Sequence, residues 1–76
     1  MNDNILNIEN KEDNLFNFKK FLTHKDSIII KNCSFLKIII KSKINKIIIE
    51  KSNNIKIKLS DTISGIEINN SKNINL

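Results

Sequence analysis

The sequence predicts an all-β fold, a parallel β-helix in which short strands stack coil upon coil. Three observations predict it: residues 28–76 repeat with a 19-residue period, apolar residues alternate within each repeat, and Ile is abundant while Pro is absent. A fixed period of this length is typical of solenoids, whose repeats bury their apolar side against neighbouring repeats. Period-two alternation and β-branched side chains favour strands over helices.

The repeat divides into rows 28–46, 47–65 and 66–76, the last of which is partial. The rows align without a gap, so equivalent residues should stack in columns at the strand spacing of about 4.8 Å. The predicted inward columns are Ile28/Ile47/Ile66, Ile30/Ile49/Ile68, Leu36/Ile55/Ile74, Ile38/Ile57/Leu76, Ile40/Leu59, Ile44/Ile63 and the small residues Cys33/Ser52/Ser71. The rows should therefore share one narrow core made mostly of Ile.

Residues 1–27 precede the repeat and are predicted to form N-terminal strands that cap the stack within a single domain. A first strand is expected over 4–9 and a turn over 10–14. The segment 15–22 is ambiguous, because its phenylalanines alternate as in a strand while other apolar residues share a helical spacing. An open end of a stack needs a cover, which favours the strand.

Polar corners rich in Asn and Ser are expected at 32–34, 52–54 and 70–72. Asn suits such corners because it tolerates a left-handed backbone and bonds to its own main chain. Gly65, the only glycine, is predicted to meet a backbone requirement in the connection that ends its row.

The composition excludes nucleic acid as an expected partner. The net charge is +5, but all 13 cations are Lys, and the chain has no Arg, Trp or Tyr. Nucleic-acid binders normally use Arg forks on phosphate and guanine, or aromatic rings that stack on bases. Abundant Lys, Asn and Ile are also typical of an AT-rich genome. Most of these lysines are therefore expected to be solvated surface residues.

The residue types needed for catalysis are also missing. His24 is the only histidine and is expected in an exposed turn, and Cys33 is expected to be a packed thiol. Alone they make neither a nucleophile–base set nor a metal site, and one glycine makes no phosphate-binding loop. A single cysteine suits a reducing cytosol. The prediction is a binding module without catalysis, cofactor, signal peptide or membrane span.

The connection 41–46 carries the strongest site candidates that the residues alone indicate: Lys41, Lys43 and Lys46. The equivalent connection one row later, 60–65, is neutral to acidic, so the fold does not require this lysine cluster. Outward-facing Lys and Ile residues nearby make a mixed cationic and apolar surface. That surface suits a protein partner with acidic patches, or it reflects the general abundance of Ile, and the residues favour neither alternative.

Several motifs occur in a specific order and spacing. Residues 8–13 read IENKED, 30–33 read IKNC, 38–47 read IIIKSKINKI and 60–72 read SDTISGIEINNSK. These motifs resemble the C-terminal, CARP-repeat domain of cyclase-associated proteins, in which V-E-N-Q-E-D, I-x-K-C, I-x-I-K-G-K-I-N-S-I and D-D-V-V-G-I-V-E-I-I-N-S-K follow one another. The chain departs from the family at Leu6 for Trp and at Ser42 for Gly. The resemblance covers nearly the whole chain and about the first half of the family's domain.

The resemblance implies a right-handed β-helix that binds monomeric actin, prefers its ADP form, promotes nucleotide exchange and filament turnover, and acts in the cytoplasm with the cytoskeleton. A homodimer is the other assembly that it implies. The expected actin-binding residues are Lys41, Lys43, Asn45 and Lys46, with Lys37, Lys56 and Lys58 adjacent. One alternative is a β-helix like tubulin-folding cofactor C, which is disfavoured because that group uses an arginine and this chain has none. The other alternative is a truncated, self-assembling structural fragment.

Overall fold

The computed structural model describes residues 4–18 and 23–76 of the chain, and within them every regular element is a strand. The strands are β1 (Asn4–Glu9), β2 (Glu12–Phe18), β3 (Asp26–Lys31), β4 (Ser34–Glu50), β5 (Asn53–Asn69) and β6 (Lys72–Asn75). All of the strand pairs are parallel. The predicted all-β, parallel β-helix is confirmed.

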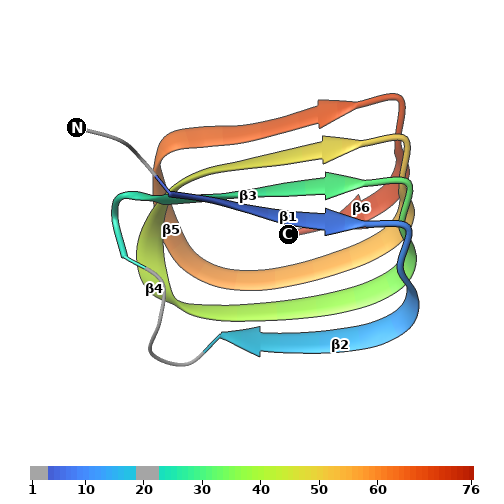
Figure 1. The fold of residues 1–76 in the computed structure, drawn as a ribbon, viewed down its shortest axis with the longest axis horizontal. Helices are drawn as coiled ribbons and strands as arrows, with labels where there is room; N and C mark the ends of the chain where they lie inside the picture. The colour runs from blue at the N-terminus through green and yellow to red at the C-terminus, as the bar shows by residue number, and fades with distance from the viewer. Residues whose placement is uncertain (1–3, 19–22) are drawn as a thin grey trace.

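Two flat faces enclose the core (Figure 1). The β1 face consists of β1, β3 and the later parts of β4 and β5, which pair in that order. The β2 face consists of β2, the earlier parts of β4 and β5, and β6. The long strands β4 and β5 therefore run along the β2 face, bend, and return along the β1 face, so that each contributes to both layers.

The predicted period is confirmed where the stack is regular, as in the register Leu36↔Ile55↔Ile74. The first coil is longer, because more residues separate Leu6 from its partner Ile28 than separate Ile28 from its partner Ile47. β1 matches the expected strand over 4–9, but the expected turn over 10–14 is wrong from residue 12 onward, where β2 begins. The strand expected over 15–22 is confirmed to residue 18, and its remainder lies outside the described residues.

Twelve apolar side chains form the core, and ten of them are Ile. They are Ile8, Ile28, Ile30, Cys33, Leu36, Ile38, Ile40, Ile44, Ile47, Ile49, Ile55 and Ile57. The last coil has no further coil stacked on it, so Ile68 and Leu76 remain 42% and 60% exposed although the period assigned both to inward columns. In the middle coils, Ile47 and Ile49 are instead covered on both sides, Ile47 by Ile28 and Ile66 and Ile49 by Ile30 and Ile68.

One predicted inward column is wrong. Ile44 is fully buried, but Ile63 is 54% exposed. The register slips here: Ile44 pairs with Thr62, one position short of the regular period, and the regular period returns where Lys46 pairs with Gly65. A shift of one residue turns a side chain to the opposite face of a strand. Gly65 restores the register with a φ of +96°, which confirms the backbone requirement predicted for it.

The corner after each strand of the β1 face contains two left-handed residues, three positions apart. The pairs are Asn10/Asp13, Asn32/Phe35, Lys51/Asn54 and Asn70/Asn73. A left-handed backbone costs a residue with a Cβ about 1–2 kcal/mol, and Asn and Asp tolerate it best. Six of the eight positions carry Asn or Asp, as expected of the corners, and only Phe35 and Lys51 do not.

Inside the corners, the column Cys33/Ser52/Ser71 forms a hydrogen-bonded ladder. The backbone N–H of Cys33 donates to Ser52 Oγ at 3.1 Å, and the N–H of Ser52 donates to Ser71 Oγ at 3.1 Å. Each hydroxyl in turn donates to the carbonyl two residues before it. Cys33 is buried, and its thiol donates to backbone carbonyls, so it is the packed thiol that the sequence predicted.

Replacing Ser52 with Ala should destabilise the chain by about 1–3 kcal/mol, because the buried N–H of Cys33 loses its acceptor. Thermal unfolding followed by circular dichroism measures this change. The matched control is Ser60→Ala, which removes an exposed hydroxyl whose bond to the Lys41 carbonyl is 3.5 Å long. Equal destabilisation by the two variants would show that the ladder contributes nothing beyond ordinary surface hydrogen bonds.

Candidate functional site

Four lysines lie together on the β2 face. Lys37 of β4 and Lys56 of β5 are directly opposite each other in the register, and Lys58 follows two residues later on the same side of β5. Lys41 lies at the end of the β4 stretch that forms this face, and all four side chains are exposed. Like charges placed directly opposite each other destabilise a sheet. The arrangement therefore does not serve the stability of the fold.

These lysines border two adjoining depressions. One, of about 550 Å³, is lined by Asn17, Ile39, Ile40, Lys41, Lys58, Leu59 and Ser60. The other, of about 360 Å³, is lined by Lys37, Lys56, Ile57, Lys58, Asn75 and Leu76. Lys58 lines both, so the two depressions and their four lysines are treated as one site and named the lysine groove.

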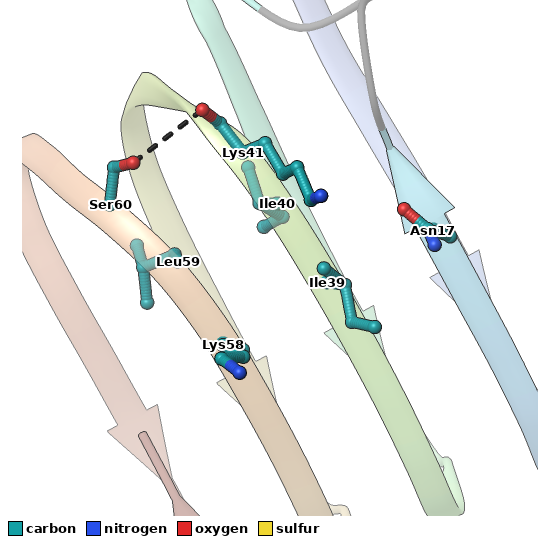
Figure 2. Close-up of a pocket in the computed structure, with 7 residues that line it drawn as sticks. All are labelled: Asn17, Ile39, Ile40, Lys41, Lys58, Leu59 and Ser60. Atoms are coloured by element: carbon teal, nitrogen blue, oxygen red, sulfur yellow. Dashed lines mark hydrogen bonds between the residues drawn. The ribbon is translucent and has the colours of Figure 1, made fainter.

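Three neighbouring strands build the larger depression (Figure 2). β2 contributes Asn17, β4 contributes Ile39 and Lys41, and β5 contributes Lys58 and Ser60. Ser60 Oγ donates to the Lys41 carbonyl at 3.5 Å, which links the two strands where they bend away from the face. The larger depression thus combines two lysines with an apolar and neutral polar lining, which is suited to a ligand that is acidic and partly apolar.

The lysines of the β1 face are in a different state. Lys31 Nζ lies 3.8 Å from Glu50 Oε1, and Lys46 Nζ lies 3.4 Å from Glu67 Oε1. In the described part of the chain no carboxylate forms an ion pair with any of the four groove lysines. Positive charge is therefore neutralised on one face and left available on the other.

Glu67 shows how the β1 face neutralises its charge. A hydrogen bond from the Asn69 side chain lowers the pKa of the Glu67 carboxyl below its ordinary value, and the hydrogen bond and charge of Lys46 lower it further. The Asn69 Nδ2 to Glu67 Oε2 distance is 3.0 Å. Glu67 is therefore ionised at neutral pH, and it keeps Lys46 engaged within the fold.

The structure separates the residues that the sequence grouped in the connection 41–46. Lys41 joins Lys37, Lys56 and Lys58 in the lysine groove. Lys46 is paired with Glu67 on the β1 face, and Lys43 in the bend also has an interaction within the fold.

Asn45, the fourth residue predicted in this connection, hydrogen-bonds to the coil before its own and to the coil after it. Its Nδ2 donates to Ser27 Oγ at 3.1 Å, and its Oδ1 accepts from Ser64 Oγ at 3.0 Å. Both polar ends of the side chain are thus used by the fold. The arrangement ties the bends of three successive coils together.

Two lining residues and one exposed aromatic were not singled out from the sequence. Asn17 and Ser60 line the larger depression, but nothing in their local sequence distinguishes them from other polar residues. Phe35 is different: it occupies a corner position at which the other coils carry Asp13, Asn54 and Asn73. Alignment of the corners could have revealed this exception.

No cluster of metal-binding side chains occurs among residues 4–18 and 23–76, where no three His, Cys, Asp or Glu residues come together. His24 lies in an exposed turn. The described residues include no helix that could cross a membrane.

The whole sequence matches a known protein family. The model of the family described as "Adenylate cyclase associated (CAP) C terminal" matches residues 1–76, the full length of the chain. Neither the curated proteins nor the solved structures include a significant match to this sequence.

Proposed function

Because the chain belongs to the adenylate cyclase associated (CAP) C-terminal family, we propose that it binds monomeric actin, prefers the ADP-bound form and promotes exchange of the bound nucleotide. The observation that carries the proposal is the family match over all residues from 1 to 76. The family is known for actin binding and consists of binding modules rather than enzymes. The proposed setting is the cytoplasm, in association with the cytoskeleton.

The lysine groove is the proposed contact with an acidic surface of actin. Its four lysines are exposed, adjacent and without an ion pair among the described residues, so binding need not break a bond within the fold. Opposite charge on the partner would also relieve the repulsion between Lys37 and Lys56. Lys43, Asn45 and Lys46 are proposed as a border of this contact, with a smaller share because each is already engaged.

Promotion of nucleotide exchange needs no chemical step by this chain. A ligand shifts a conformational equilibrium only by as much as its affinities for the two states differ. A stiff β-helix face can act in this way if it fits best the actin conformation from which nucleotide dissociates. The linkage is reciprocal, so a preference for ADP-actin means that bound module and bound ADP favour each other at equilibrium. Faster exchange then requires an additional gain in affinity at the open conformation.

The test is a titration of fluorescently labelled ADP-actin and ATP-actin monomers with the purified chain. The proposal expects saturable binding with a lower Kd for ADP-actin, and faster release of a fluorescent nucleotide from actin in the same samples. A folded chain that binds neither form would refute the proposed function. Binding without faster release would keep actin binding and remove the exchange activity. Sedimentation of the chain alone tests the homodimer and the self-assembling alternative.

A further inference from the structure

One aromatic residue on the β2 face, Phe35, has a backbone conformation that bulky residues rarely adopt. Phe35 has a φ of 54°, in the left-handed region where a bulky residue is an outlier. It is 55% exposed, so burial does not compensate for the backbone strain. The other corners place Asp13, Asn54 and Asn73 at this position, and these residue types tolerate the conformation.

A second exposed apolar residue lies close to Phe35 in the register. Leu15 of β2 is directly opposite Lys37 of β4, and Phe35 precedes Lys37 by two residues. Leu15 and Phe35 are therefore diagonal neighbours on adjacent strands, a relation that brings long and aromatic side chains within reach of each other. Leu15 is 62% exposed. The two residues are named the apolar pair.

The apolar pair adjoins the lysine groove through Lys37. This lysine is opposite Leu15 on one side and opposite Lys56 on the other, and it lines the smaller depression. The β2 face thus carries two large apolar side chains beside a run of cations that lack ion pairs in the described chain. Aromatic residues such as Phe are enriched at protein interfaces, and charges beside them can match a partner of opposite charge.

We propose that Phe35 and Leu15 anchor a partner segment in which apolar side chains stand next to carboxylates, the carboxylates occupying the lysine groove. The inference rests on the proposed actin binding and adds to it the residues that provide the apolar anchor and the chemistry of the segment they take. Charge complementarity favours an acidic segment as the occupant: the same groove of a second copy would bring further lysines, whereas carboxylates neutralise those present.

The test is Phe35→Asn, which installs the residue type that other corners use. Strain relief should raise the melting temperature by about 4–8 °C, the shift that about 1 kcal/mol of stabilisation gives in a domain of this size. Actin affinity should nevertheless fall at least about 10-fold, because the anchor is lost. Higher stability together with weaker actin binding would show that Phe35 anchors the partner, because loss of a structural residue would lower both. Leu15→Asn should weaken binding in the same way, with little change in melting temperature.

Lys51→Asn is the matched control, because Lys51 is the other left-handed corner residue of the described chain that is neither Asn nor Asp, and it lines neither depression. This variant should be stabilised and should bind actin as the original chain does. If the original chain binds actin and Phe35→Asn binds equally well, the inference is wrong and the proposed function stands. If the original chain does not bind actin, the proposed function fails. Reduced self-association in Phe35→Asn, with unchanged actin affinity, would assign the apolar pair to contacts between copies and overturn the inference.

Discussion

Charge reversal in the lysine groove, Lys56→Glu together with Lys58→Glu, should weaken actin binding at least about 100-fold, or roughly 2.7 kcal/mol. Both side chains are exposed, and Lys58 lines both depressions. An acidic partner surface would then meet like charge, which costs several kcal/mol when the groups are juxtaposed. The β-sheet circular dichroism signal should be unchanged, because a Glu opposite Lys37 replaces a repulsive pair with an attractive one.

The control for this double variant is Lys25→Glu together with Lys51→Glu, which changes the net charge equally at exposed positions outside both depressions. It should lose only the part of the affinity that arises from long-range attraction, and salt at about 0.15 M screens that part beyond about 8 Å. Equal losses in the two double variants would mean that actin responds to net charge rather than to the groove. Undiminished binding by the groove variant would rule out this contact surface.

Ile44→Ala should destabilise the fold by about 2–5 kcal/mol, which in a chain of 76 residues threatens folding altogether. The side chain is fully buried in the bend between the two faces, so its truncation removes apolar contacts and leaves a cavity. Ile63→Ala should change stability by less than about 0.5 kcal/mol, as surface substitutions do. The exposed fraction of Ile63, 54%, is the reason for the contrast.

The comparison of these two variants tests the register itself, because both residues occupy the same position in the repeat. Urea unfolding followed by circular dichroism gives the free energy of each, and an unchanged dependence on urea concentration shows that the same surface is exposed. Similar losses of unfolding free energy for Ile44→Ala and Ile63→Ala would mean that the stack keeps its regular period through the bend. The one-residue register shift between β4 and β5 would then not occur.

Sequence reasoning predicted the core well on the two flat faces because both of its signals agree there. In columns such as Ile30/Ile49 and Ile38/Ile57, the alternation within a row and the period between rows select the same side chain, and all four residues are buried. In the bend the two signals separate. The period assigns Ile63 to the core. Ile44 pairs with Thr62 instead, one residue earlier than the period requires, so the Ile63 side chain turns outward.

The candidate site was predicted less completely, for a related reason. Proximity in sequence grouped Lys41, Lys43 and Lys46, but they lie on a bend that joins two different faces. Lys46 pairs with Glu67 on the β1 face, while Lys41 lies with Lys58 on the β2 face. The adjacent position of Lys37, Lys56 and Lys58 was expected from the aligned rows, and the parallel register brings them together.

The sequence by itself determined the class of fold, the inward columns of the flat faces and the polar corners, because each depends on residue type repeated at a fixed interval. Only the tertiary structure decided that Lys41 lies with Lys58 while Lys46 pairs on the other face, and that the register slips between Ile40 and Lys43. It also decided that Phe35 occupies a left-handed corner while exposed. These features depend on how far the chain advances through a bend. Side-chain direction there follows from backbone geometry and strand pairing, which periodicity does not encode.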